Sequence, residues 1–304
     1  MSRKVKLIFN PIANQGRAWS VASALRPIVM ELGGADWYET AYPTHATELA
    51  AISAEQGYDL VVAMGGDGTM HEVLNGLMQI PEERRPQLGV IPTGSGNDFA
   101  FACGLSPYPE EALRQVLTGT PSTVDIGKLK DHQGHEKYWA NAIGIGFDTI
   151  VTLNSRNIKI GQGFWIYFLA VLQTILFQYE PFSLKMKIDQ EEWETNLLML
   201  VLMNGKREGG GFYVTPESKP DDGHLDLLGV NRVSRLRMLR ILPEILSGTQ
   251  AKLPDCTLKQ FRDIEIESDR PLYIHADGEI IATPPEKIDH LSINIIENGI
   301  QVVR

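Results

Sequence analysis

Residues 61–69 read Val61-Val62-Ala63-Met64-Gly65-Gly66-Asp67-Gly68-Thr69, an apolar run that passes directly into a glycine-rich turn. The run predicts a strand, and the residues from about Met70 predict a helix. Glycine accepts positive φ and lets a ligand approach the backbone, while a helix N-terminus offers unpaired N–H groups. We therefore predict a phosphate site here, with Asp67 as a metal or water ligand and Thr69 as the helix cap. For this motif alone, a tight βα loop without a ligand is the alternative.

A second loop of small residues follows the next predicted strand. Residues 87–91 lead into Pro92-Thr93-Gly94-Ser95-Gly96-Asn97-Asp98. Open α/β sheets bind ligands beyond the carboxyl ends of their strands, so two such loops on neighbouring strands predict a shared cradle. Neither standard nucleotide motif accounts for them. The sequence has no glycine run that closes on Gly-Lys-Ser/Thr, and Gly94-Ser95-Gly96 continues without the third glycine of the dinucleotide motif.

Strands and helices alternate through the first 120 residues or so. Strands are predicted at residues 5–9, 35–38, 60–64 and 87–91, and helices at 19–32, 46–56, 69–78 and 109–119. Pro27 is expected to kink the first helix or shift its start. The alternation predicts an α/β domain with a parallel sheet and helices on its faces.

The pattern changes after Pro121. Strands are predicted at residues 122–130, 138–143, 182–189, 195–203, 225–230, 261–267, 272–276 and 291–296, with helices near 164–177 and 234–246. Strands joined by turns, with few helices between them, predict a largely antiparallel second domain. The domain boundary is predicted near residue 123.

Two segments raise the question of lipid contact. Residues 163–179 predict a helix that is apolar on nearly every face but shorter than the roughly 20 residues a membrane span needs. Burial against a sheet is the favoured interpretation, and a lipid entrance or a bilayer contact is the alternative. The arginines at 232, 235, 237 and 240 are compatible with anionic headgroups or with a solvated basic helix.

Composition bounds the remaining choices. The chain has 304 residues, 43% of them hydrophobic, which is near the size at which one core splits in two. Its formal net charge of −10 argues against a nucleic-acid partner. Cys103 and Cys256 lie far apart without metal-ligand spacing, so we expect reduced thiols. The apolar run after Lys4 is too short for a signal peptide, and we expect a cytoplasmic protein.

Five motifs, in order, resemble the diacylglycerol kinase catalytic family, specifically its soluble bacterial lipid-kinase branch. They are Asn10-Pro11, Gly65-Gly66-Asp67-Gly68-Thr69, Thr93-Gly94-Ser95-Gly96-Asn97-Asp98-Phe99, Asp221-Asp222-Gly223-His224-Leu225-Asp226 and Asp277-Gly278-Glu279. The second motif is shared with NAD kinases, and related turns occur in phosphofructokinases. The later motifs favour the lipid branch.

The resemblance implies two domains. The first, residues 1–123 with a returning tail at 290–304, is a nucleotide-binding α/β domain like those of phosphofructokinases and NAD kinases. The second, residues 124–289, is a mainly antiparallel β-sandwich that binds the lipid substrate. ATP is expected in the cleft between them, with its phosphoryl group transferred to a lipid hydroxyl, diacylglycerol or a related glycerolipid being the first choice.

The resemblance also implies the nucleotide-contacting residues: Asn10, Pro11, Ile12, Ala13, Asn14, Thr40, Gly65, Gly66, Asp67, Gly68, Thr69, Met70, His71 and Thr93. Many relatives have small residues and glycine where this chain has Ile12-Ala13-Asn14. At this loop, therefore, the implied nucleotide contacts come from residues that differ from those of many relatives.

Catalytic and metal positions follow from the later motifs. Asp277 and Glu279, with Asp67, are implied as catalytic residues, and which of the first two accepts the lipid proton stays open. Mg²⁺ is implied at the carboxylate of Asp222 and the backbone carbonyls of Lys219 and His224. For Asp277-Gly278-Glu279 taken alone, a hairpin turn with solvated acids is the favoured interpretation, and the ordered set of motifs reverses that preference.

Two other functions remain open at this point. An NAD kinase shares the first glycine loop, but its second motif normally pairs asparagine with glutamate, whereas Asn97 is followed here by Asp98. A non-catalytic lipid- or nucleotide-binding module is disfavoured because the implied base and metal positions are all filled. The expected partners are a lipid substrate and the inner face of a membrane, contacted peripherally. No nucleic acid is expected, and a homodimer is compatible with the sequence.

Overall fold

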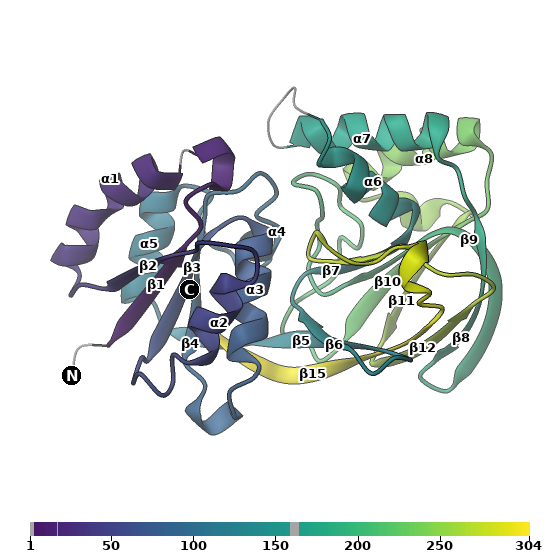
Figure 1. Cartoon of the computed structure of the whole chain (residues 1–304). Helices are drawn as coiled ribbons and strands as arrows, with labels where there is room; N and C mark the ends of the chain where they lie inside the picture. Colours follow the sequence, from purple (N-terminus) through teal and green to yellow (C-terminus); the bar gives the residue numbers. More distant parts are fainter. Residues whose placement is uncertain (1–2, 17, 159–163) are drawn as a thin grey trace. The chain divides into compact units, whose positions relative to one another are not determined.

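The computed structural model describes residues 3–16, 18–158 and 164–304 (Figure 1). They divide into two compact units. Unit 1 holds the N-terminal part up to Val124 together with Asn298–Arg304, and unit 2 holds Asp125–Glu297. Unit 1 is therefore discontinuous in sequence.

The sheet of unit 1 is parallel, which confirms the prediction from the alternating elements. Its strands lie in the order β4-β3-β1-β2, with bounds β1 Val5–Phe9, β2 Asp36–Glu39, β3 Leu60–Gly65 and β4 Gln87–Pro92. β1 and β3 are buried along their whole length, as expected for central strands with both faces covered. Beyond β4, Val302 of β15 (His290–Val303) pairs in parallel with Leu88.

The helices of unit 1 connect these strands. Their bounds are α1 Ala18–Glu31, α2 His45–Ala51, α3 Asp67–Leu77, α4 Asp98–Ala102 and α5 Pro109–Thr118, with short 3-10 turns η1 Ala13–Gly16 and η2 Glu82–Arg84. The prediction that Thr69 caps α3 is wrong. Gly66 is the N-cap residue, in extended backbone, and Thr69 is already the third residue of the helix. The five-residue α4 was not predicted.

The strands of unit 2 are antiparallel to their neighbours. They run in the order β14-β13-β7-β9-β8-β12-β15, with β10 between β9 and β11, and β5 beside β6. Their bounds are β5 Pro121–Asp131, β6 Glu136–Trp139, β7 Ala142–Gly146, β8 Phe182–Ile188, β9 Glu191–Met203, β10 Leu225–Asn231, β11 Cys256–Phe261, β12 Asp263–Ser268, β13 Ile274–Ala276 and β14 Glu279–Ala282. Buried side chains that include Trp139, Leu200 and Ile266 form the core of this β-sandwich.

Two predictions for unit 2 need correction. Residues 138–143 were expected to form one strand, but β6 ends at Trp139 and β7 begins at Ala142. The backbone N–H groups of this break bond the carboxylate of Asp277 instead of a neighbouring strand. β11, β14 and the helix α6 Phe147–Ser155 were not predicted at all.

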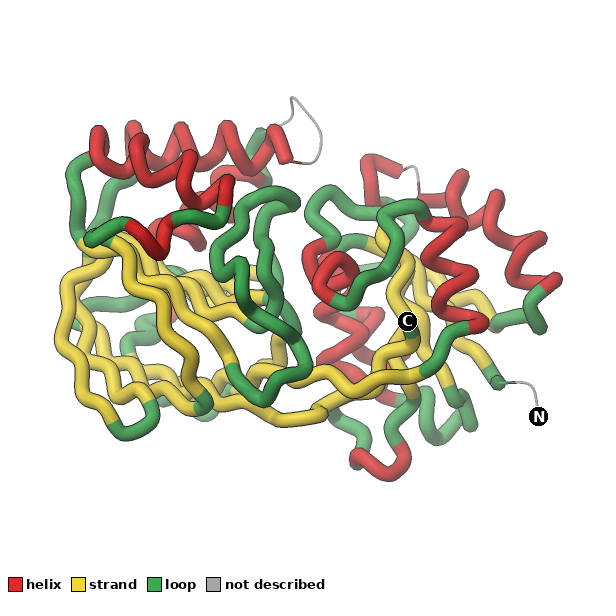
Figure 2. Tube along the Cα trace, turned by 180° about the vertical axis from the view of Figure 1, so that it is seen from behind, coloured by secondary structure: helices red, strands yellow, loops and turns green. Residues whose placement is uncertain are grey.

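Three helices cover one side of the strands in unit 2, as Figures 1 and 2 show from opposite directions. They are α6, α7 Phe164–Phe177 and α8 Arg235–Ser247, and their inner faces pack on β9 and β10 in a second apolar cluster. The 3-10 turns η3 Gln250–Lys252 and η4 Pro284–Glu286 complete the unit.

Helix α7 is only half buried, contrary to the favoured prediction for residues 163–179. Its inner face buries Ala170, Val171, Thr174 and Ile175. Its outer face exposes Trp165, Leu169, Leu176 and Phe177. Gly163, where the predicted helix begins, lies outside the described residues. Within the described ranges, no helix is both long and apolar enough to cross a membrane.

Candidate active site

The carboxyl ends of all four strands of unit 1 are tied together by backbone hydrogen bonds. The Thr40 N–H donates to the Phe9 carbonyl at 2.9 Å, and the Asn10 N–H donates to the Met64 carbonyl at 3.3 Å. The Thr93 N–H donates to the Gly65 carbonyl at 2.8 Å. β1 has β2 on one side and β3 on the other, so the strand order reverses there, which is where open α/β sheets bind ligands.

The glycines of the two loops allow close backbone contact. A Cβ on Gly94 would lie 2.4 Å from the Gly66 Cα, and a Cβ on Gly65 would lie 2.4 Å from the Thr69 Cβ. The expectation of positive φ in the first loop is wrong, because Gly66 has φ −91° and neither Gly65 nor Gly68 is among the positive-φ residues. Gly66 and Gly94 are therefore required by the proximity of the two loops, and Gly65 by its proximity to Thr69, not by a left-handed backbone.

Asp67 joins the two loops. Its Oδ2 accepts the N–H of Asn97 at 2.7 Å, and its Oδ1 accepts the N–H of Asp98 at 2.8 Å. The Asn97 side chain closes the second loop on itself, with bonds of 2.9 Å to both the N–H and the carbonyl of Gly94. Asn97 takes the left-handed conformation, with φ 54°, that begins α4. Asp67 thus fixes the cradle whatever else it binds.

The other predicted nucleotide positions divide into two groups. Asn10 and Thr93 border the cradle, and the Thr93 hydroxyl is buried without a hydrogen-bond partner among the described residues. Met70 and His71 are buried inside unit 1, with 1% and 5% exposure, and His71 is bonded to Asn75. A nucleotide could therefore contact Met70 and His71 only at their backbone atoms or from the N-terminus of α3.

The loop after β1 is more open. The Asn10 Oδ1 accepts the N–H of Ile12, and the Ile12 side chain is 79% exposed. Pro11 is the first residue after Asn10, and Ala13 and Asn14 begin η1. The side chain of Asn14 lies outside the described part of the chain. The backbone of this loop forms one border of the cradle.

The Asp277-Gly278-Glu279 turn holds its two carboxylates in different environments. Asp277 is 5% exposed, has φ 48°, and its carboxylate accepts the N–H groups of Ala140, Asn141 and Ala142 at 2.8–3.1 Å. The Glu279 side chain is 45% exposed and pairs with Arg156 at 3.1 Å. Arg156 also donates to the Gly278 carbonyl at 2.9 Å. Asp277 and Arg156 thus hold the turn in place, and the side chain of Glu279 stays accessible to solvent.

The loop that holds Asp222 is also ordered by backbone donors. The Asp222 Oδ1 accepts the N–H of His224 at 3.1 Å, and the Asp222 carbonyl lies 3.1 Å from Nδ1 of the same histidine. The N–H of Gly223, which has φ 75°, donates to Asp125 at 2.8 Å. Lys219 and Asp222 are exposed, and the imidazole of His224 is turned back onto its own loop.

Asp226 adds a second carboxylate next to this loop. It is 8% exposed, and its Oδ2 has no hydrogen-bond partner among the described residues. Burial raises the pKa of the Asp226 carboxyl, and the nearby charge of Asp222 raises it further. Two carboxylates near each other with an unsatisfied oxygen match the donor set of a hard cation such as Mg²⁺.

Residues 4–129 match the family described as "Diacylglycerol kinase catalytic domain", and residues 141–303 match "YegS C-terminal NAD kinase beta sandwich-like domain". The chain belongs to the diacylglycerol kinase catalytic family. Both its fold class and its membership of the bacterial lipid-kinase branch are therefore as the sequence motifs predict.

Individual relatives agree with this assignment. A Chromohalobacter salexigens protein named "Probable lipid kinase YegS-like" is 36% identical over 232 residues, 76% of this chain and 73% of that protein. A "Diacylglycerol kinase" of Mycobacterium tuberculosis is 28% identical over 310 residues, 99% of this chain and 95% of that protein. A crystal structure of a diacylglycerol kinase from Bacillus anthracis str. Sterne has a TM-score of 0.79 at 26% identity, over 99% of this chain and 96% of that one. The protein is a lipid kinase.

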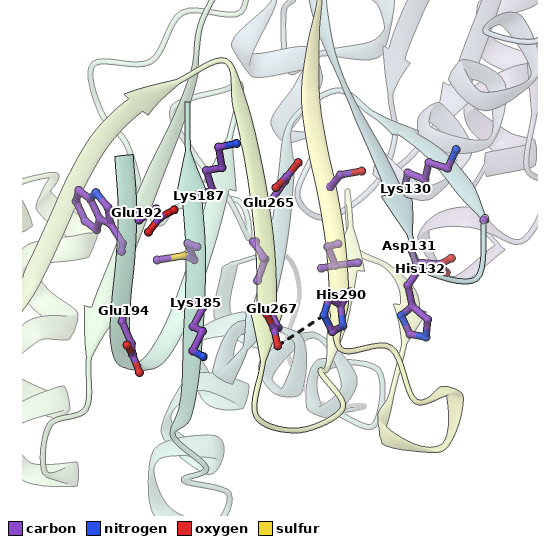
Figure 3. A pocket seen from close by; sticks show the side chains of 16 residues that line it. Lys130, Asp131, His132, Lys185, Lys187, Glu192, Glu194, Glu265, Glu267 and His290 are labelled. Atoms are coloured by element: carbon purple, nitrogen blue, oxygen red, sulfur yellow. Dashed lines mark ion pairs between the residues drawn. The ribbon is translucent and has the colours of Figure 1, made fainter. Parts of the chain in front are cut away.

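A wide pocket of about 1040 Å³ lies elsewhere on unit 2 of this lipid kinase, on the outer face of β8, β9, β12 and β15 (Figure 3). Its charges alternate between strands. Lys185 lies opposite Glu267 on one side and Glu194 on the other. Lys187 is flanked in the same way by Glu265 and Glu192. Opposite charges paired across strands stabilise a solvated sheet face, so we assign this pocket no catalytic role.

Sequence reasoning missed three residues that hold the turns and loops of the candidate site. Arg156 lies 123 residues from its partner Glu279, and Asp125 lies 98 residues from Gly223. Asn141 contributes an N–H to Asp277 from 136 residues away. None belongs to a recognisable motif, and only the fold brings them to their partners. An alignment of relatives is the signal that would single them out.

Proposed function

We propose that this lipid kinase transfers the γ-phosphoryl group of ATP to the hydroxyl of diacylglycerol or a related glycerolipid. The observation that carries the proposal is the cradle of unit 1, where two glycine loops, joined by Asp67, follow β3 and β4 beside the strand at which the order reverses. Phosphoryl transfer depends mainly on positioning and on stabilising charge, and a cradle of backbone N–H groups supplies both. ATP bound between the units is part of this proposal.

We further propose that Glu279 accepts the lipid proton and that Asp277 positions the turn. Three N–H groups bond the Asp277 carboxylate, and these bonds favour its charged form over one that takes up a proton. Glu279 has an exposed side chain whose partner, Arg156, is exposed to a similar extent. A base must come within hydrogen-bond reach of the hydroxyl, which favours the exposed carboxylate.

Mg²⁺ is the cofactor of the proposed reaction, held by the Asp222 carboxylate with the carbonyls of Lys219 and His224. The partnerless oxygen of Asp226 and the exposed Asp222 support this choice. When bound, the ion supplies positive charge beside the carboxylates of this loop. Asp222→Ala is expected to remove one bound Mg²⁺ per chain in equilibrium dialysis, and Glu217→Ala, at an exposed carboxylate earlier in the same loop, is the control. Unchanged stoichiometry in Asp222→Ala would exclude the site.

Peripheral membrane contact is proposed through the outer faces of α7 and α8. Exposed apolar side chains on these helices, Trp165, Leu169, Leu176, Phe177, Leu236 and Leu239, lie near the exposed arginines 232, 235 and 240. A face that is both basic and apolar complements an anionic bilayer, because the apolar side chains enter the interface and the arginines meet the headgroups. A cytoplasmic location at the inner face of the membrane and a homodimer stay predictions.

The test offers radiolabelled ATP and Mg²⁺ with diacylglycerol, monoacylglycerol, phosphatidylglycerol, sphingosine, ceramide or NAD. We expect label in the glycerolipid products. Labelled NADP would favour the NAD-kinase alternative. ATP binding without any labelled product would favour a non-catalytic module.

A further inference from the structure

Two histidines and one aspartate meet at one end of the wide pocket of unit 2. His132 lies in the turn between β5 and β6, Asp289 directly precedes β15, and His290 is its first residue. One ring nitrogen or carboxylate oxygen of each residue lies within 4.8 Å of those of the other two. Figure 3 shows the two imidazole rings next to each other, and their centroids are 5.9 Å apart. All three residues belong to unit 2, so the fold of that unit alone brings them together.

The backbone around this cluster is fixed by hydrogen bonds. The His132 N–H donates to the His290 carbonyl at 3.2 Å, which ties the turn to the first residue of β15. Asp131 closes the turn, because its Oδ1 accepts the N–H groups of Gln133 and His135 at 2.9 and 3.0 Å. Groups that are already held in place lose less entropy when they bind a common ligand. The two histidines are therefore positioned in advance for a shared ligand.

The separations of the ligand atoms suit one shared metal ion. Nδ1 of His132 is 3.5 Å from Oδ1 of Asp289, which is longer than an ordinary N–H···O bond of about 2.7–3.2 Å. Tetrahedral coordination with bonds of about 2.0–2.2 Å places neighbouring ligand atoms about 3.4 Å apart. Nδ1 of His290 is 2.9 Å from the same oxygen of Asp289. A shift of about half an ångström there would give the tetrahedral spacing.

Glu267 faces His290 from the neighbouring strand. The second ring nitrogen of His290, Nε2, is 3.8 Å from the Glu267 carboxylate on β12 (Figure 3). A histidine that binds a metal through one nitrogen usually directs its other N–H to a carboxylate, which fixes the ring and raises its basicity. Glu267 and Asp289 also bring two negative charges, which attract a divalent cation.

The residue types favour one class of metal. Two imidazoles and one carboxylate form a donor set of Zn²⁺, whereas Mg²⁺ prefers oxygen ligands alone. The side chains of His132, Asp289 and His290 are 39%, 40% and 53% exposed, so an ion can reach them from solvent. Three protein ligands leave the fourth tetrahedral position to water.

We propose that His132, Asp289 and His290 bind Zn²⁺, and that the ion crosslinks the turn between β5 and β6 to the start of β15. Glu267 orients His290 in this site. The proposal does not depend on lipid phosphorylation. It also differs from the proposed Mg²⁺ site at Asp222 in the ligands that it uses and in its position in unit 2.

Equilibrium dialysis of the untagged chain tests the ligands. The dialysis uses Zn²⁺ in an excess of Mg²⁺, so that sites for hard cations are occupied, and atomic absorption measures the zinc. We expect one Zn²⁺ per chain at this site. His132→Asn and His290→Asn are each expected to weaken its binding by roughly 100-fold or more, because loss of an outer partner of a ligand already costs about 10- to 100-fold.

His135→Asn is the matched control for the dialysis. His135 lies in the same turn, but its ring bonds Asp131 and it is not one of the three proposed ligands. We expect the wild-type zinc affinity in this variant. Absence of bound zinc in the wild type would overturn the proposal, and so would wild-type affinity in folded His132→Asn and His290→Asn.

Hydrogen exchange of the wild-type chain tests the crosslink without any variant. Zn²⁺ is expected to slow the exchange of the amides at residues 132–135 and 289–290, because opening of the turn then requires loss of the ion. Mg²⁺ in place of Zn²⁺ is the control and is expected to leave these amides unchanged. Equal exchange with and without Zn²⁺ would overturn the crosslink.

A matched pair of variants tests the role of Glu267. Glu267→Gln is expected to weaken zinc binding about tenfold, as for other carboxylates that orient a ligand histidine. Glu265→Gln, two residues earlier on the same exposed face of β12, is the control and is expected to bind zinc as the wild type does. Equal zinc affinity in the two variants would overturn the assignment of Glu267 as the residue that orients His290.

Discussion

At the scale of single residues, Asp277 and Glu279 lie in opposite environments although they are two positions apart. The buried carboxylate of Asp277 accepts three backbone N–H groups, whereas that of Glu279 is exposed beside Arg156. A buried acceptor that serves several donors is costly to remove, because each donor left without a partner costs about 1–3 kcal/mol. Under the proposed function, we therefore expect a substitution at Asp277 to lower stability and one at Glu279 to lower turnover.

The first prediction uses this difference. Glu279→Gln is expected to lower kcat by roughly 10² to 10⁴, the usual contribution of a general base, with folding and MgATP affinity unchanged. Asp277→Asn is expected to lower the urea midpoint, because an amide cannot accept at every position that the carboxylate fills. Steady-state kinetics, nucleotide titration and urea unfolding on both variants provide the measurements. Wild-type kcat in Glu279→Gln would remove it as the proton acceptor.

A second prediction concerns contact between the loops of unit 1. Gly94→Ala places a Cβ about 2.4 Å from the Gly66 Cα, and a backbone atom must move to admit it. We expect weaker MgATP binding by calorimetry, with the remaining strands still folded by circular dichroism. Gly229→Ala is the control, since its Cβ would meet only Leu197 at 3.7 Å, an ordinary contact. Equal nucleotide affinity in both variants would contradict a shared cradle.

The third prediction is a pH dependence that originates at Lys6. Its side chain is completely buried, and burial lowers the Lys6 pKa from 10.5 to about 8. Between these values the unfolded chain binds the proton more than the folded chain does, so the free energy of unfolding rises with pH. The full gain is at most about 3 kcal/mol. The Lys6 Nζ donates hydrogen bonds to the Leu49 carbonyl and to Gln56. These bonds favour the charged lysine, so they reduce the gain in stability.

The measurement compares urea unfolding of the wild type and Lys6→Met at pH 8 and at pH 10.5. The difference between the two proteins isolates Lys6 from the tyrosines that also titrate in this range. A difference that stays constant across this range would show that Lys6 remains charged in the folded protein.

Sequence motifs identified the residues of the cradle but not their partners. The Gly-rich loops, Asp67 and the Asp277 turn all carry local patterns that a single sequence displays. The donors to Asp277 are backbone groups about 136 residues away, with no side-chain chemistry to mark them. For the same reason the role of Asp67 as a link between loops was not predicted: its acceptors face the N–H groups of Asn97 and Asp98, which any residue type would supply.

At the scale of elements, the strand and helix pattern predicted unit 1 better than unit 2. A parallel sheet buries both faces of its strands, so continuous apolar runs such as residues 60–65 are easy to recognise. In unit 2, the predicted strand at residues 138–143 spans the break between β6 and β7, where backbone N–H groups bond Asp277. α7 is apolar on both faces, and composition alone does not distinguish a buried face from one that is exposed for contact with lipid.

The fourth prediction belongs to the pair α7 and α8. Arg235→Glu with Arg240→Glu is expected to weaken binding to phosphatidylglycerol-containing vesicles by about 30-fold, from roughly 1 kcal/mol per arginine near an anionic surface. Lys185→Glu with Lys187→Glu changes the net charge equally on the sheet face of Figure 3 and serves as the control. Sedimentation with the vesicles measures both. An equal loss in the two double variants would mean that only net charge matters.

At the scale of the whole molecule, the family and both fold classes follow from five short motifs in order. Residues 290–294 of β15 pair with β12 in unit 2, and Val302 pairs with β4 in unit 1. β15 thus pairs with a strand of unit 2 at its start and with a strand of unit 1 at its end. The hydrophobic alternation of its sequence does not show the residue at which the pairing changes.

The fifth prediction follows from that strand. Deleting residues 299–304 removes the buried side chains Ile300, Val302 and Val303, a loss of about 5 kcal/mol or more from unit 1. It also removes the Gly299 carbonyl that Arg85 bonds and the paired bonds between Thr120 and Arg304. We expect loss of MgATP binding and rapid proteolysis before residue 125, with the apolar core of unit 2 intact. Gln301→Ala, at an exposed position of the same strand, is the control.

The order of synthesis gives β15 a further consequence. Residues 298–304 leave the ribosome after all 173 residues of Asp125–Glu297, which takes roughly 10 to 35 seconds at ordinary translation rates. Throughout that interval the nascent chain holds β1 to β4 while the outer edge of β4 lacks its neighbour. An unpaired strand edge is a template for another chain. Growing chains of this kinase are therefore most exposed to mispairing on polysomes, and a chaperone that shields the β4 edge during translation would protect them.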